Sequence, residues 1–403
     1  MLNIVVLNGG RGAASIIPAL LRRDGLNVTS IVNAYDDGKS TGEIRRFFDM
    51  LGPSDIRKVQ ELMLPEGDDL PSSKALFEYR YPVGTSRDDV LADMRQFSDG
   101  GATIAGIAIP SPSILAAIRR FVGEFLHGLT VIEKVMGRQF SFDDCALMNC
   151  LYAGAYLALG RDIERTTRTF DRLFRLKGTV IPNSMENKWL TAMRRNGELL
   201  SCEAEIVELR SNVLIDALYL LDRPLDRAPL EQLDSDEQRY YLQRHHAAAA
   251  ASPGVRLALE QADIIIYSAG TQHSSLYPTY MSQGVAEMIS GNRGALKVFV
   301  TNIGADYETP TYCASDYLEG ALRYLRMGDG RVYDPADLFS TVLVNDGRRK
   351  ADETYVHHDS ERDGDIAIPR IVADFESAQA PGKHDGDKVV SCILKLYGET
   401  MEG

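Results

Sequence analysis

The stretch Ile4-Val5-Val6-Leu7-Asn8-Gly9-Gly10-Arg11-Gly12 decides the fold, because a short apolar run passes directly into a glycine-rich turn. Four apolar residues rich in β-branched side chains are typical of a strand that is buried on both faces, as in parallel sheets. Residues 13–21 follow with helical spacing, although Pro18 should kink such a helix. Strand, turn and helix together predict an α/β sheet whose glycine turn presents backbone N–H groups to an anion.

Similar apolar runs recur at 29–34, 264–267, 297–300 and 341–344 and indicate further buried strands of the same sheet. We therefore expect an α/β fold, a three-layer sandwich with a Rossmann-like, mainly parallel sheet. Residues 1–60 and 260–403 should form its nucleotide-binding core, with 61–259 inserted as a largely helical lobe. Within that lobe a β-hairpin is expected near 189–203, where Asn196-Gly197 suits a type I′ turn.

The second motif, Asp36-Asp37-Gly38-Lys39-Ser40, follows the run at 29–34. In dehydrogenases an acid about 20 residues after the glycines binds a ribose hydroxyl. Two adjacent carboxylates could instead hold a divalent metal such as Mg²⁺ beside a phosphate, or orient a nucleophilic hydroxyl. A solvated turn that caps the next helix is the third interpretation. Lys39 could reach a phosphate as a point charge, although a surface lysine is the default interpretation.

The third motif, Ser268-Ala269-Gly270-Thr271 with Ser274-Ser275 close behind, follows the run at 264–267. Hydroxyl groups at the start of a helix commonly contact phosphate together with the backbone N–H groups there. Because the carboxyl ends of parallel strands share one edge of a sheet, this motif and the glycine turn should line one ligand cleft.

Several further segments carry a family resemblance: Gly52-Pro53-Ser54-Asp55-Ile56-Arg57, residues 76–82, 177–182 and 263–278, Asn302 with Glu308-Thr309, and Lys383-His384-Asp385. Together with the glycine turn and the Asp36-Asp37 motif, they follow the order found in the CofD/YvcK superfamily of phospholactate transferases and gluconeogenesis factors. The chain is therefore identified as a member of that superfamily. It is more similar to the gluconeogenesis-factor branch, because the extended acidic signature of deazaflavin-substrate binding does not follow Asp36-Asp37.

The resemblance implies a protein that binds a nucleotide or a UDP-sugar-like nucleotide-sugar and regulates central carbon or cell-envelope metabolism. The alternative is a transferase that moves a phospho-acid from a nucleoside diphosphate donor to a hydroxyl, releases nucleoside monophosphate and uses Asp36 and Asp37 as catalytic or Mg²⁺-binding groups. A Rossmann NAD(P) oxidoreductase is disfavoured, because Ser15 replaces the third glycine of its fingerprint. The expected nucleotide and phosphate contacts are Asn8, Gly9, Gly10, Arg11, Gly12, Lys39, Ser40, Gly270, Thr271, Ser274, Ser275, Asn302, Lys383 and His384.

The charge, cysteine content and apolar runs of the sequence indicate what kinds of partner the protein can have. The 403 residues carry a formal net charge of −13, which argues against a nucleic-acid partner. Six cationic residues between 161 and 177 alternate with acids, as on a solvated helix face. Five cysteines without a Cys-x-x-Cys pair indicate a reducing compartment, and no apolar run is long enough to span a membrane. We expect a cytoplasmic protein with a small-molecule ligand and no tightly bound cofactor, and we leave homo-oligomerisation open.

Overall fold

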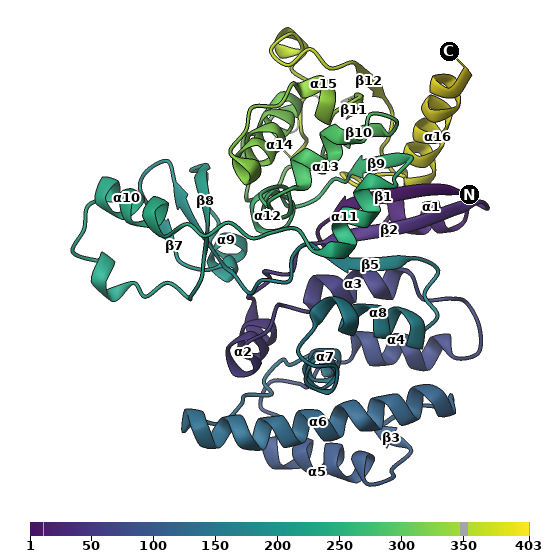
Figure 1. Cartoon of the computed structure of the whole chain (residues 1–403), viewed down its shortest axis with the longest axis vertical. Coiled ribbons are helices and arrows are strands. Elements are labelled where there is room, and N and C mark those ends of the chain that lie inside the picture. The colour runs from purple at the N-terminus through teal and green to yellow at the C-terminus, as the bar shows by residue number, and fades with distance from the viewer. Residues whose placement is uncertain (11, 347–353, 403) are drawn as a thin grey trace.

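The computed structural model describes residues 1–10, 12–346 and 354–402, which form a seven-stranded parallel sheet flanked by helices (Figure 1). Its strands, from one edge to the other, are β5 (Thr179–Pro182), β2 (Leu26–Val32), β1 (Leu2–Asn8), β9 (Ile264–Tyr267), β10 (Leu296–Val300), β11 (Thr341–Asn345) and β12 (Arg370–Ala373). The central strands are buried on both faces, since the last five residues of β1 and all four residues of β9 are buried. The expected α/β fold is confirmed.

The strand order places a topological switch point in the middle of the sheet. The chain begins at β1, continues to β2 and β5 on one side, and later resumes at β9 on the other side of β1. Ile4 pairs with Ile264 and Leu7 with Tyr267, so both strands end at the same level. Open α/β sheets bind ligands at the carboxyl ends of strands where the order reverses in this way. The segments that leave β1 and β9 therefore define the candidate site.

Helices cover both faces of this sheet. On one face α1 (Ile16–Leu21) packs against the C-terminal helix α16 (Gly386–Glu402), and on the other α11 (Pro253–Glu260), α13 (Val285–Gly291) and α14 (Ala314–Asp329) pack side by side. Pro18 lies in the first turn of the six-residue α1, where its missing N–H would have no helical partner in any case. The proline is therefore accommodated, and the expected longer helix is shortened at its beginning. The short segments η2 (Gln272–Leu276), α12 (Tyr277–Tyr280), α15 (Pro335–Leu338) and η3 (Ser360–Arg362) complete this part.

A helical lobe extends from the β5 edge of the sheet (Figure 1, lower part). Next to β5 lie α3 (Ser54–Leu62) and α8 (Ile163–Leu173), and beyond them α7 (Leu147–Ala158), α6 (Pro112–Met136) and α5 (Arg87–Ser98) pack in succession. The lobe also contains α2 (Lys39–Phe48), α4 (Leu70–Glu78), β3 (Thr103–Ile104) and β4 (Ile107–Ala108). None of the helices within the described ranges is long and apolar enough to cross a membrane.

A second, antiparallel sheet projects beside the main sheet (Figure 1, left). It consists of β7 (Leu199–Leu200), β6 (Trp189–Arg194) and β8 (Ile215–Leu221), accompanied by α9 (Glu203–Glu208), η1 (Ala228–Leu230) and α10 (Ser235–His245). The expected hairpin is present, since Ala192 pairs with Leu200. Its turn is not of type I′, because Gly197 alone has a positive φ of 86° and its N–H donates to Arg194 O at 3.0 Å. A turn followed by one left-handed glycine suits this longer loop.

Two strands of the main sheet come from segments in which no strand was expected. β5 lies within residues 61–259 yet pairs with β2, with Ile31 opposite Ile181. β12 follows the last strand that was expected, at 341–344, and it pairs with β11. The central helical segment is therefore interrupted by an edge strand of the core sheet.

Candidate functional site

The glycine turn after β1 packs tightly against the segment after β9. A Cβ added to Gly9 would lie 2.1 Å from Ser275 Cβ, and one added to Gly12 would lie 2.3 Å from Ala269 O. No real Cβ tolerates such distances, so glycine at these two positions is what allows the segments to touch. Asn8 holds the turn from within, because its Oδ1 accepts a hydrogen bond from Ala13 N at 3.1 Å. Arg11 lies outside the described residues.

Several backbone donors remain unused where these segments meet. Gly9 and Gly10 are buried, yet neither N–H donates to any residue that the structure describes. The N–H of Thr271 is likewise unpaired within the described ranges, and Thr271 is only half-buried. Buried amides without a partner are rare in folded proteins. The two segments therefore offer a cluster of amide donors of the kind that binds anionic groups.

Asn302, in the segment after β10, fixes the glycine of the third motif. Its Oδ1 accepts a hydrogen bond from Gly270 N at 2.9 Å, and its Nδ2 donates to Gly270 O at 3.0 Å. Gly270 has a φ of 156°, a conformation that side-chain-bearing residues rarely adopt. Asn302 thus positions the backbone next to Thr271.

Glu308 is a buried carboxylate that organises the start of η2. Its oxygens accept hydrogen bonds from His273 N at 2.8 Å, from Ser274 N at 2.9 Å and from Ser274 Oγ at 2.5 Å. Burial, followed by the nearby Asp306, raises the pKa of Glu308 to about 7. Burial also lowers the pKa of His273 to about 3, so this imidazole is neutral at pH 7. Ser274, expected to contact phosphate, is instead committed to Glu308, while the Ser275 hydroxyl accepts from Thr271 Oγ1 at 2.9 Å.

Asp36 and Asp37 occupy different environments. Asp37 is buried, its Oδ2 forms an ion pair with Arg46 at 2.8 Å, and its N–H donates to Glu203 Oε2 at 3.0 Å. Burial raises the pKa of Asp37, and the charges of Arg45 and Arg46 oppose that shift. Asp36 is half-buried and uses Oδ1 to accept from Gly38 N at 3.1 Å. Within the described ranges each aspartate therefore keeps one carboxylate oxygen without a partner: Oδ2 of the half-buried Asp36, and Oδ1 of Asp37, which is itself buried.

The guanidinium of Arg45 binds the backbone next to this acidic pair. Arg45 is fully buried, donates to Tyr35 O and Asn187 Oδ1 at 2.9 Å each, and lies 4.1 Å from the centroid of the Trp189 ring. Burial lowers the pKa of Arg45, while Asp37 and Asp36 raise it. The arginine thus ties the Asp36-Asp37 segment to the antiparallel sheet.

Two further carboxylates face Asp36. Asp36 and Asp55 both contribute to raising the pKa of buried Glu203, after the larger effect of burial itself. Asp55 lies against the glycine turn, where a Cβ added to Gly10 would be 2.5 Å from Asp55 Oδ1. Lys58 forms an ion pair with Asp55 at 2.8 Å, and Asp55 is the main cause of the raised pKa of Lys58. The candidate site, which we call the nucleotide crevice and define by residues 9–10, 12, 36–37, 55 and 270–275, therefore places carboxyl groups beside the amide donors.

Lys39 and Ser40 do not join this group. Lys39 is exposed and forms an ion pair with Asp144 at 3.1 Å. Ser40 Oγ is buried and accepts a hydrogen bond from Asn149 Nδ2 at 3.2 Å. Both residues instead connect the start of α2 to the segment around the start of α7.

The segment containing Lys383 and His384 does reach the carboxyl edge of the sheet. Gly382 O accepts a hydrogen bond from Gly304 N at 3.1 Å, which places residues 382–384 beside the end of β10. Lys383 is exposed, and its charge lowers the pKa of Asp306 against a larger opposing effect of burial. Burial lowers the pKa of His384 to about 4. A segment near the C-terminus thus borders the crevice.

The Mg²⁺ expectation fits Asp37 poorly. A guanidinium 2.8 Å from Asp37 Oδ2 occupies the position that a cation would need. Within the described ranges no group of three or more His, Cys, Asp or Glu side chains has a geometry suited to a metal ion. A metal bound through Asp37 Oδ2 does not fit this arrangement, and Asp37 Oδ1 is buried, whereas Asp36 could share a metal with a phosphate.

The sequence interpretation did not select Asp55, Lys58, Glu203 or Glu308 as site residues. Asp55 and Glu308 lie in segments quoted only for the family resemblance, so a signal existed. Glu203 follows the hairpin and has no local motif, and it reaches Asp37 only through the fold of the antiparallel sheet.

Comparison with known proteins identifies the family. The family model described as 2-phospho-L-lactate transferase CofD matches residues 4–376. The chain belongs to this family. A putative gluconeogenesis factor of Thermotoga maritima is 23% identical over 409 residues, which covers 98% of this chain and 99% of that protein. A gluconeogenesis factor of Listeria innocua is 22% identical, over 98% of this chain and 95% of that protein.

Solved structures of relatives confirm the fold of this CofD-family protein. A Bacillus halodurans protein, in a crystal structure at 20% identity, superimposes with a TM-score of 0.66 over 98% of this chain and 99% of that one. A second crystal structure, of a UPF0052 family member from the same organism, gives the same TM-score at 19% identity. At these identities the likeness concerns the fold alone.

Proposed function

We propose that this CofD-family protein binds a nucleotide-sugar, such as a UDP-sugar, and acts as a regulator of the gluconeogenesis-factor type. The observation that carries the proposal is the set of amides of Gly9, Gly10 and Thr271, which have no partner among the residues that the structure describes and lie at the switch point between β1 and β9. Backbone donors at this position suit a diphosphate, because they approach its oxygens closely and carry partial positive charge.

The acidic side of the crevice favours a sugar next to the diphosphate. Asp36 keeps a carboxylate oxygen that can accept a hydrogen bond from a sugar hydroxyl. Burial raises the pKa values of Asp55 and Glu203, and a hydroxyl can pair with a carboxyl group in either protonation state, because it both donates and accepts. A second anionic group in the same place would be repelled by these carboxylates. The distribution of donors and acceptors therefore suits a ligand with one anionic part and one hydroxyl-rich part.

The alternative function is transfer of a phospho-acid. A substrate hydroxyl oxygen would attack the β-phosphorus of the donor, the bond from that phosphorus to the bridging oxygen would break, and nucleoside monophosphate would leave. Asp36 favours this alternative, because its free oxygen could accept the hydroxyl proton or hold Mg²⁺ shared with the phosphates. Asp37 is not suited to either role, since Arg46 and burial fix it.

A thermal-shift panel tests the proposal. UDP-, GDP- and ADP-sugars, the corresponding free diphosphates and NAD⁺ are added to the full chain with and without Mg²⁺. We expect at least one nucleotide-sugar to raise the melting temperature more than its free diphosphate, because the sugar adds contacts to the native state only. No shift with any compound would contradict the proposal. Multiple-turnover release of nucleoside monophosphate from an activated phospho-acid and a hydroxyl acceptor would favour the transferase.

A further inference from the structure

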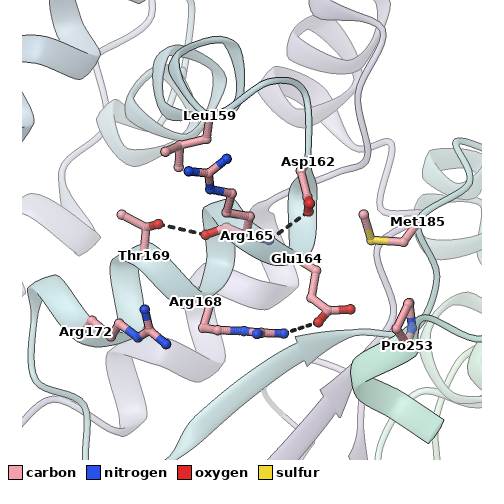
Figure 2. Close-up of a pocket in the computed structure, with 9 residues that line it drawn as sticks. All are labelled: Leu159, Asp162, Glu164, Arg165, Arg168, Thr169, Arg172, Met185 and Pro253. Atoms are coloured by element: carbon pink, nitrogen blue, oxygen red, sulfur yellow. Dashed lines mark hydrogen bonds and ion pairs between the residues drawn. The ribbon is translucent and has the colours of Figure 1, made fainter. Parts of the chain in front are cut away.

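A second candidate site, separate from the one after β1 and β9, lies along helix α8, which packs next to β5. The cavity has a volume of about 510 Å³, and nine residues line it: Leu159, Asp162, Glu164, Arg165, Arg168, Thr169, Arg172, Met185 and Pro253 (Figure 2). This volume falls within the range of about 300–1,000 Å³ that is typical of small-molecule sites. None of these residues belongs to the crevice between β1 and β9.

Three arginines project from one face of α8 into this cavity. Arg165, Arg168 and Arg172 are spaced by three and four residues, so they lie one above another on the same helix face. Figure 2 shows them in sequence along the helix, with Thr169 between them. A planar guanidinium presents several N–H groups in a fork that matches a phosphate or carboxylate.

Only one of the three arginines is neutralised by a neighbour within the described ranges. Arg168 forms an ion pair with Glu164, whose other oxygen accepts a hydrogen bond from Gly254 N at 3.1 Å. Neither Arg165 nor Arg172 has an ion pair with a described carboxylate, although each opens onto the same cavity. Asp162 is occupied as the cap of α8, where it accepts from Arg165 N at 2.8 Å. Two guanidinium groups are therefore available to an anion.

One part of the cavity wall is apolar. Leu159, Met185 and Pro253 come from three different segments; Figure 2 shows Leu159 beside Arg165, and Met185 and Pro253 on the side away from Arg172. A free inorganic anion would leave this wall and much of the volume unused. The site thus combines a cationic side with an apolar side, as sites for small organic anions do.

We propose that this cavity binds a small phosphate-bearing organic molecule at a site separate from the nucleotide crevice. Arg165 and Arg172 hold the phosphate, Thr169 lies between them, and the carbon skeleton of the ligand lies against Met185 and Pro253. A nucleic acid is disfavoured as the occupant, because the chain has a net charge of −13 and the basic residues between 161 and 177 alternate with acids. The solvated helix face expected from sequence is replaced by a binding face in this proposal.

Titration calorimetry with the full chain tests this site. The probes are inorganic pyrophosphate, glycerol phosphate and ribose 5-phosphate, each up to millimolar concentration. We expect a phosphate monoester to bind more tightly than pyrophosphate, because only the monoesters offer an organic part to the apolar wall. In the double variant Arg165→Gln/Arg172→Gln the affinity should fall at least tenfold, as expected when two charge-assisted hydrogen-bonding groups are lost.

A matched control separates the site from general charge effects. Arg175→Gln/Lys177→Gln removes two exposed cations just beyond α8 that do not line the cavity, and it should leave the affinity unchanged. Thr271→Pro, which alters the nucleotide crevice, should also leave it unchanged. Absence of binding by every probe, equal affinity in the Arg165→Gln/Arg172→Gln variant, or loss of binding in Thr271→Pro would each overturn the proposal.

Discussion

The side-chain amide of Asn302 binds both the N–H and the carbonyl of Gly270: Asn302 Oδ1 accepts from Gly270 N at 2.9 Å, and Asn302 Nδ2 donates to Gly270 O at 3.0 Å. Residues that follow two neighbouring strands, β9 and β10, are thus joined where the ligand is proposed to bind. The consequence is that the amide of Thr271 has a fixed position before any ligand arrives.

Asn302→Ala should therefore weaken ligand binding as well as the fold. Loss of both hydrogen bonds should lower the free energy of unfolding by about 1–3 kcal/mol, and the freed Gly270 should weaken nucleotide-sugar affinity at least fivefold. Urea unfolding and calorimetry measure the two effects. Asn292→Ala is the control, since Asn292 also donates to two backbone carbonyls, of Leu259 and Ala262, but lies outside the crevice. Equal loss of affinity in both variants would contradict a specific role for Asn302.

Asp36→Asn should affect mainly ligand affinity, and Asp37→Asn mainly stability. Asp37 neutralises Arg46 in a buried position, so its loss should lower the free energy of unfolding by about 1–3 kcal/mol, with little change in ligand affinity. Asp36→Asn keeps an oxygen for Gly38 N and should leave stability unchanged, but it removes an acceptor for a ligand hydroxyl and should weaken binding. Unfolding and calorimetry on both variants provide the comparison. A larger loss of affinity from Asp37→Asn than from Asp36→Asn would show that Asp37, and not Asp36, binds the ligand.

Arg45→Lys should destabilise the protein strongly although it keeps the charge. A lysine cannot reproduce the hydrogen bonds to Tyr35 O and Asn187 Oδ1 or the planar contact with Trp189. We expect a loss of about 2–5 kcal/mol in the free energy of unfolding. Arg46→Lys, in a half-exposed neighbour paired with Asp37, should cost less than about 1 kcal/mol. Comparable losses for the two variants would contradict the importance assigned to the buried guanidinium.

Glu308 should make stability depend on pH. Its pKa of about 7 in the folded state lies above its ordinary value of 4.5, so between these pH values the folded protein retains a proton that the unfolded chain has lost. The stability that this proton provides is present below pH 4.5 and disappears as pH rises to about 7. The difference in melting temperature between wild type and Glu308→Gln should therefore decrease over this interval. A difference in melting temperature between the two proteins that stays constant from pH 4.5 to pH 7 would rule out the raised pKa of Glu308.

The sequence predicted the strands that are buried on both faces, because uninterrupted apolar runs such as Ile264–Tyr267 distinguish them. It did not predict β5 or β12. β5 has only four residues and ends in a proline, and β12 is partly exposed, so neither has the apolar signal of a central strand. Edge strands are recognised through their pairing, which is a tertiary property.

The candidate site was predicted in part for the same reason. The glycine turn and the Gly270 segment could be located because each follows a recognisable strand. Glu203 could not, since it meets Asp37 across 166 positions of sequence. Lys39 and Ser40 follow Asp37 directly in the chain, yet the start of α2 turns them toward Asp144 and Asn149. Proximity in sequence indicated the segment correctly but not the direction of these side chains.

The most direct measurement of the central claim is calorimetry of nucleotide-sugar binding to wild type, Thr271→Pro and Thr271→Val. Thr271 has a φ of −64°, which proline also adopts, so the proline variant removes the unpaired N–H without changing that backbone angle. The valine variant removes only the hydroxyl and serves as the control. If backbone amides hold the diphosphate, Thr271→Pro should weaken binding at least tenfold and Thr271→Val less than threefold. Equal affinities in wild type and Thr271→Pro would contradict the proposed site.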